Sequence, residues 1–130
     1  MKEYKVFMID DEESMRISVS QYLSLANHEV TCFGQAKSAL SLIDDEFNGV
    51  IISDIRMPQM DGLELLEQVK IIDKEIPVIL ITAHGDISMA VSAIRTGAYD
   101  FIEKPFDPDN YICPLTNIMN PFYSIISVLI

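Results

Sequence analysis

Five polar residues, each within two positions of the end of a short apolar run, carry the strongest chemical signal in this sequence: Asp10, Asp11, Asp54, Thr82 and Lys104. In an open parallel sheet, ligands bind outside the carboxyl ends of the strands. If the apolar runs are strands of one such sheet, these residues meet along one edge. The sequence therefore predicts three carboxylates, one hydroxyl and one ammonium group at a single site.

Three carboxylates at one edge need a compensating cation. Two carboxylates about 4 Å apart repel each other by about 4 kcal/mol at an effective dielectric constant near 20. With oxygen donors and no neighbouring His or Cys, the ion expected is a hard divalent cation, Mg²⁺ first. Mg²⁺ combines one or two carboxylates with water and phosphate oxygens, so the site predicts a phosphoryl group, whose remaining charge Lys104 balances.

Taken one at a time, the same residues have simpler explanations. The acidic residues Asp11, Glu12 and Glu13 suit the N-terminus of a helix, where they cap it or favour its dipole. A lone Asp after a strand, such as Asp54, is typical of a turn. A lone Thr or Lys carries no information. The conjunction of all of them on one edge is what favours a functional site.

The elements that position these residues alternate along the chain. Continuous apolar runs are typical of strands that are covered on both faces, and they occur at residues 6–9, 50–52, 78–81 and, more briefly, 101–102. Val30 and Cys32 alternate with polar neighbours and predict an edge strand.

Helical patterns lie between the runs. Apolar residues at helical spacing span 15–26, 36–43, 65–72 and 87–94, and Gly97 is expected to stop the last of these helices. Regular alternation of strands and helices predicts an α/β fold, a doubly wound parallel sheet with helices on both faces.

Four motifs in this order resemble the receiver domain of two-component response regulators. They are Asp10-Asp11, the run D-x-x-M-P-x-M-D-G at 54–62, Thr82-Ala83 and Lys104-Pro105-Phe106. The resemblance covers Val6 to about Phe106. Residues 81–87 and 97–106 are similar to receivers of sigma-54-dependent transcriptional activators of the nitrogen-regulation and dicarboxylate-transport classes.

The resemblance implies a fold and a metal site. The fold is a five-stranded sheet of flavodoxin-like order 2-1-3-4-5, with an atypical region in place of the fifth helix. Asp54 is then the phosphoacceptor. Asp11, Asp54 and the Arg56 carbonyl bind Mg²⁺ directly, and Asp10 acts through water.

The same resemblance implies a signalling switch and not an enzyme beyond self-phosphorylation and self-dephosphorylation. A sensor histidine kinase, or a small phosphodonor, phosphorylates Asp54. Thr82 and Lys104 bind phosphoryl oxygens, and Phe101 is the aromatic switch residue. The phosphoryl group biases a surface around the fourth helix and fifth strand. The output activity is expected to be transcriptional and to belong to another domain. The chain is therefore either a single-domain regulator or a receiver cut from a longer, homodimeric protein, and the second is favoured.

Two other functions are considered. A phosphatase of the haloacid-dehalogenase type also uses a strand-end Asp, but its D-x-D-x-T pattern matches poorly, with Glu12 and Ser14 at those positions after Asp10. A pseudo-receiver would bind partners without phosphorylation. The complete set of phosphoacceptor-site residues argues against this interpretation, because such a protein does not need them.

Composition excludes other classes. The 130 residues fit one domain; they are 49% apolar and 22% charged, and the net charge is −11. Nine cations among twenty anions make no basic patch, so direct nucleic-acid binding is not expected. No signal peptide begins the chain, and a cytoplasmic protein without membrane attachment is the default expectation.

The expected domain organisation is a receiver at 1–109 and an uncharged tail at 110–130. A fifth helix is expected to begin near Pro108, but Pro114 and Pro121 would each break it. A membrane span fits the tail poorly, and a frame-shifted or vector-derived end is favoured over a natural one. We predict no long helix from Tyr111 to Ile130, although its apolar residues should partly cover the sheet or else pair with another chain.

Two residue types are assigned no role in the chemistry. Met57, Met60 and Met89 are expected to pack rather than to form a partner surface. His28 and His84 are considered as phosphate relays, and His84 is interpreted as an ordinary surface residue.

Overall fold

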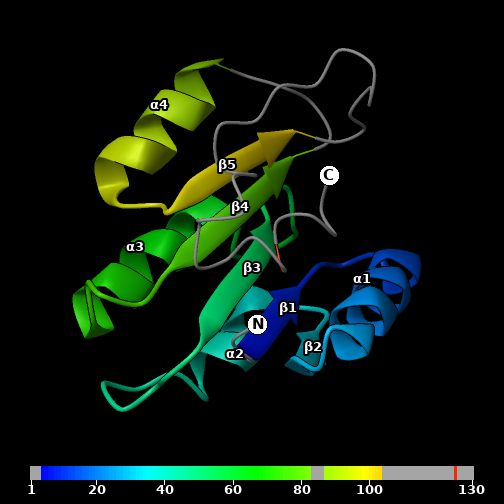
Figure 1. Cartoon of the computed structure of the whole chain (residues 1–130). Coiled ribbons are helices and arrows are strands. Elements are labelled where there is room, and N and C mark those ends of the chain that lie inside the picture. Colours follow the sequence, from blue (N-terminus) through cyan, green and yellow to red (C-terminus); the bar gives the residue numbers. More distant parts are fainter. Residues whose placement is uncertain (1–3, 83–86, 104–124, 126–130) are drawn as a thin grey trace.

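The computed structural model describes residues 4–82, 87–103 and Ile125. Within them, strands and helices alternate as the sequence predicts (Figure 1). The strands are β1 (Lys5–Ile9), β2 (Glu29–Phe33), β3 (Val50–Asp54), β4 (Val78–Thr82) and β5 (Asp100–Glu103). The helices are α1 (Glu13–Leu25), α2 (Ala36–Leu40), α3 (Gly62–Ile72) and α4 (Ile87–Thr96).

All five strands are parallel and form one sheet in the order β2-β1-β3-β4-β5, as predicted. The chain leaves β1 towards β2 on one side and returns to β3 on the other. β1 and β3 are therefore the neighbours at which the strand order reverses, and ligands bind at this switch point in such sheets. The predicted carboxylates follow β1 and end β3.

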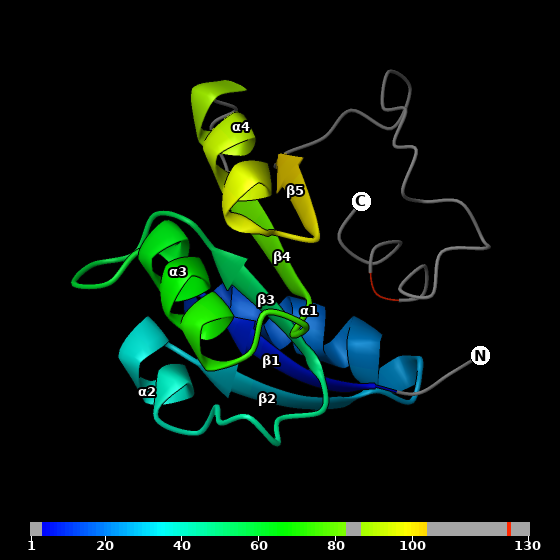
Figure 2. The same cartoon turned by 90° about the vertical axis from the view of Figure 1, so that its left-hand side faces the viewer.

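Apolar clusters cover both faces of the sheet. Along β1, Phe7 and Ile9 belong to the cluster shared with α2 and α3, and Val6 and Met8 belong to the cluster shared with α1. Figure 2 shows α1 and α3 on opposite sides of the strands. Burial on both faces explains why the inner strands are continuous apolar runs. β2 is the exposed edge strand that the alternation predicted.

Local signals set the helix ends. α3 begins at Gly62, because Asp61 accepts a hydrogen bond from the Glu64 amide and forms a capping box with that residue. α4 stops before Gly97, as predicted: this glycine has φ +116°, and the Ala98 amide donates to the Ala93 carbonyl.

The tail is described at one position. Ile125 is fully buried and belongs to the cluster on the α1 face. The expectation that the tail partly covers the sheet is therefore confirmed at this residue. The expected break at Pro114 and Pro121 lies outside the described residues. Among those described, no helix is long and apolar enough to cross a membrane.

Candidate functional site

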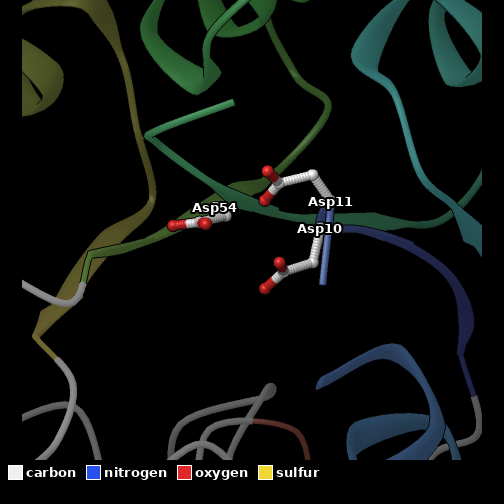
Figure 3. A group of neighbouring side chains, drawn as sticks. All are labelled: Asp10, Asp11 and Asp54. Atoms are coloured by element: carbon white, nitrogen blue, oxygen red, sulfur yellow. The ribbon is translucent and has the colours of Figure 1, made fainter. Parts of the chain in front are cut away.

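Three carboxylates gather at the switch point between β1 and β3. Asp10 and Asp11 follow β1, and Asp54 ends β3. One carboxylate oxygen from each lies within 4.8 Å of the others (Figure 3). Asp10 is buried, Asp54 is half-buried and Asp11 is exposed. The predicted convergence of the three acidic residues is confirmed.

Main-chain groups hold Asp10 at this edge. Its amide donates to the Phe33 carbonyl at the end of β2, 3.1 Å away. Its Oδ1 accepts from the Glu12 amide at 2.9 Å. Glu12 is the N-cap residue of α1, but its side chain makes no cap hydrogen bond. Helix capping by the Glu12 side chain is thus not seen, whereas Glu13 lies in the first turn of α1, where an acidic side chain favours the helix dipole as expected.

Asp54 is held by its own strand and by the start of α3. Its Oδ1 accepts from the Ile55 amide at 2.9 Å, and the Ser53 hydroxyl donates to its main-chain oxygen at 2.9 Å. The Gly62 amide donates to the Ile55 carbonyl at 2.8 Å. A Cβ at position 62 would collide with the Asp54 carbonyl oxygen, so only glycine lets α3 start this close to the acidic residue.

The remaining predicted residues divide into described and undescribed ones. Thr82 ends β4 and is buried; Asp54 pairs with Ile81 in the sheet register, so Thr82 lies at the same edge. Phe101 packs, partly buried, against the cluster on the α3 face, and Arg56 is exposed just beyond β3. Lys104 and Ala83 lie outside the described residues.

The oxygen atoms suit a hard divalent cation. Ligands on opposite sides of a Mg²⁺ ion are about 4.2 Å apart, since each lies about 2.1 Å from the metal. The observed spread of 4.8 Å is close to this span. All three groups are carboxylates, which Mg²⁺ prefers to nitrogen or sulfur donors. The residues present therefore fit such an ion.

Residues set aside in the sequence lie away from this chemistry. Met57 is buried in the core, and Met60 and Met89 pack against it, which confirms the packing interpretation. His28 is buried just before β2, at the opposite end of that strand from the site, where its Nδ1 accepts from the Tyr4 amide at 2.9 Å. His84 lies outside the described residues.

Sequence reasoning missed two contributors to the site. One is the capping box of Asp61 and Glu64, which the D-x-x-E spacing before an apolar run signals. The other is Arg16, whose Nη1 donates to the Asp10 carbonyl at 2.7 Å. A cation in the first turn of a helix was the available signal for Arg16, because the helix dipole disfavours it there.

The fold and the site define a class of protein: a parallel α/β domain with an acidic cluster at its switch point. The comparisons identify the family. Residues 6–113 match the response regulator receiver domain, and the chain belongs to that family.

Curated relatives include transcriptional regulators. The chain is 50% identical over 107 residues to the C4-dicarboxylate transport transcriptional regulatory protein DctD of Rhizobium meliloti, which is 82% of this chain and 23% of the relative. It is 41% identical over 107 residues to the DNA-binding transcriptional regulator NtrC of Salmonella typhimurium, again 82% and 23%. The predicted resemblance to these classes is confirmed. The chain spans about a quarter of the length of each.

Solved receiver structures share the fold. The chain matches the crystal structure of FixJ-N with a TM-score of 0.74 and 43% identity, over 84% of this chain and 87% of the other. It also matches the solution structure of the beryllofluoride-activated NtrC4 receiver domain dimer, with a TM-score of 0.73 and 37% identity, over 84% and 88%.

Proposed function

We propose that this chain is a phosphorelay switch in which Asp54 accepts a phosphoryl group in a Mg²⁺-dependent reaction. The observation that carries the proposal is the convergence of Asp10, Asp11 and Asp54 within 4.8 Å at the switch point of a receiver fold. The donor is a phosphohistidine of a sensor kinase or a small phosphodonor. The phosphorus–donor bond breaks as an Asp54 oxygen bonds to phosphorus, and the donor keeps the electron pair.

The residues around Asp54 have separate roles in this proposal. Asp11, Asp54 and the Arg56 carbonyl hold Mg²⁺ directly, and Asp10 holds it through water. Bound there, the ion supplies charge neutralisation for the transferring phosphoryl group. A carboxylate is a weak nucleophile that needs alignment rather than a base. The Ile55 amide supports that alignment by fixing Asp54 Oδ1 at 2.9 Å.

The remaining residues respond to phosphorylation of Asp54. The Thr82 hydroxyl and the Lys104 ammonium bind phosphoryl oxygens, and Phe101 changes position with Thr82. The surface formed by α4 and β5 then favours one of two states. DctD and NtrC are transcriptional regulators by name. We extend this role to the protein that contains this receiver, with control of an output domain and homodimerisation.

Covalent labelling tests the proposal. The chain is incubated with acetyl phosphate and Mg²⁺, reduced with borohydride and mapped by mass spectrometry. We expect one adduct at Asp54 that is absent from Asp54→Asn and from samples in EDTA. Asp45→Asn, at an exposed position, is the matched control and should label like the parent. Equal labelling of Asp54→Asn and the parent would refute the assignment, and rapid turnover without an adduct would indicate a phosphatase.

The metal assignment has its own test. Mg²⁺ should raise the melting temperature, because it binds the native state and relieves repulsion among the carboxylates. Asp11→Ala should lose most of this increment, and the Asp45→Asn control should keep it. If Asp11→Ala and the parent gain equally from Mg²⁺, Asp11 is not a ligand.

A further inference from the structure

We infer that Arg16 is a positioning residue for the acidic site. Its guanidinium fixes the peptide that joins Asp10 to Asp11, and thereby the direction in which Asp11 presents its carboxylate. The inference rests on the proposed function, because it concerns the same cation and phosphoryl site.

The contacts of Arg16 bring three elements together. Arg16 lies in the first turn of α1, and its Nη1 donates to the main-chain oxygen of Asp10 at 2.7 Å, a short, charge-assisted hydrogen bond. A Cβ at Gly34, just after β2, would lie 3.4 Å from Nη1, so the guanidinium also borders that turn. Cys32 Sγ is 3.8 Å from the Arg16 carbonyl oxygen. The side chain is half-buried.

The bond to the Asp10 carbonyl completes the support of that residue. Its amide is held by the Phe33 carbonyl and its side chain by the Glu12 amide. The peptide bond is planar, so the direction of a carbonyl also sets the direction of the next residue. Asp11 is exposed and is therefore not fixed by burial. The Arg16 contact therefore orients Asp11 through the main chain.

Helix stability does not account for an arginine at this position. A cation in the first turn opposes the helix dipole, which favours Asp or Glu there. Its guanidinium instead reaches back to the acidic end of β1, where it donates to the Asp10 carbonyl. Arginine also suits this role better than lysine, because its planar group presents several donors in a fixed geometry.

Mg²⁺ titration of the melting temperature tests the inference, with MgCl₂ as the probe and EDTA as the baseline. The variants are Arg16→Met, Arg16→Lys and the matched control Arg95→Met, which removes the same charge from the exposed end of α4. We expect Arg16→Met to bind Mg²⁺ about tenfold more weakly, the lower range for groups that support metal ligands. Arg16→Lys should recover part of the affinity, and Arg95→Met all of it.

Labelling by acetyl phosphate supplies a second readout. In Arg16→Met, the rate of labelling at Asp54 should fall at limiting Mg²⁺ and return to the parental value at saturating Mg²⁺. The change therefore lies in the Mg²⁺ concentration that is needed and not in the maximal rate. A role confined to folding would not produce this shift.

Three results would overturn the inference. Parental Mg²⁺ affinity in Arg16→Met, with only a lower melting temperature in EDTA, would make Arg16 merely structural. Higher affinity would show that the guanidinium competes with the ion. A parent without any Mg²⁺ response would overturn the proposed metal site and this inference with it. If the parent does respond, the metal site stands and the variants test the role of Arg16 alone. If Arg16→Met does not fold, Arg16→Gln is read by the same criteria.

Discussion

At the scale of single residues, the acidic site is held mainly by main-chain groups. The Asp10 and Asp54 carboxylates each accept a hydrogen bond from an amide within two residues, and the Asp10 amide is tied to β2. Local bonds of this kind keep both side chains at the strand ends, where carboxylates would otherwise turn away from one another.

Thr82 should couple phosphorylation to the rest of the domain without being needed for the chemistry. It is buried at the end of β4, beside the strand that carries Asp54. We expect Thr82→Ala to be labelled at Asp54, more slowly, but not to change self-association on labelling as the parent does. Light scattering before and after acetyl phosphate treatment measures this. Full loss of labelling would place Thr82 in the transfer step instead.

A second residue-scale prediction concerns pH. Asp100 begins β5, and its Oδ2 is buried without a hydrogen-bond partner within the described chain. Burial raises the pKa of this carboxyl, although the Phe101 amide, which donates to Oδ1, partly lowers it. The folded state thus binds this proton more tightly than the unfolded state. The favourable contribution of protonated Asp100 to the free energy of unfolding is complete below the unfolded pKa of about 3.9. It is lost as pH rises through the folded pKa.

Asp100→Asn should remove this loss. Relative to the parent, the variant should gain free energy of unfolding as pH rises from 4 to 7. Urea denaturation at several pH values measures the difference, and Asp45→Asn controls for removing a carboxyl from an exposed position. A difference between Asp100→Asn and the parent that does not change with pH would contradict the prediction.

At the scale of elements, strand positions could be predicted because burial on both faces leaves continuous apolar runs. Helix ends were less accessible. The stripe that ends at Ile43 predicted a longer second helix, but α2 stops at Leu40 and tighter turns follow, with the Ile43 amide donating to the Leu40 carbonyl. Ile43 stays buried, so its apolar character reports packing and not helix.

The site, like the secondary structure, could be predicted only in part. The three carboxylates could be predicted because the ends of parallel strands share an edge, which depends on topology alone. For Arg16, the sequence signals only an unusual cation near the start of α1. It does not specify the partner, because the contact joins a side chain to a main-chain oxygen.

The start of α3 gives an element-scale prediction. Gly62→Ala would place a Cβ against the Asp54 carbonyl oxygen and 2.9 Å from the Ile55 Cα. Both are main-chain atoms that cannot turn aside, so α3 must move away from β3. We expect a loss of about 1–3 kcal/mol in the free energy of unfolding, as for other overpacked sites, and slower labelling at Asp54.

Urea denaturation and acetyl phosphate labelling together measure this effect. Gly34→Ala is the matched control, since its Cβ would meet only the Arg16 guanidinium within 4 Å, no closer than 3.4 Å. Its stability should change little. If Gly62→Ala is as stable as Gly34→Ala and is labelled at the parental rate, the close approach of α3 does not position Asp54.

At the scale of the whole molecule, the two faces of the sheet are covered differently. On one face, α3 contacts both α2 and α4. On the other face, α1 packs mainly against β1 and β2. Even so, Ile79, Ile81 and Ile102 of β4 and β5 are buried on that face, in the same cluster as Ile125. Ile125 thus contributes to burial on that face together with α1.

The last prediction follows from this arrangement. Ile125→Ala should lower the free energy of unfolding by about 2–5 kcal/mol, the usual effect of removing a large buried side chain. Leu42→Ala, at a side chain that is 60% exposed, is the control and should change stability by no more than about 0.5 kcal/mol. A chain that ends at Asn110 should be less stable still and should self-associate, because it exposes the apolar face of β4 and β5. Urea denaturation and light scattering measure both effects. If that shortened chain is as stable and as monodisperse as the full chain, residues beyond Asn110 do not close the sheet.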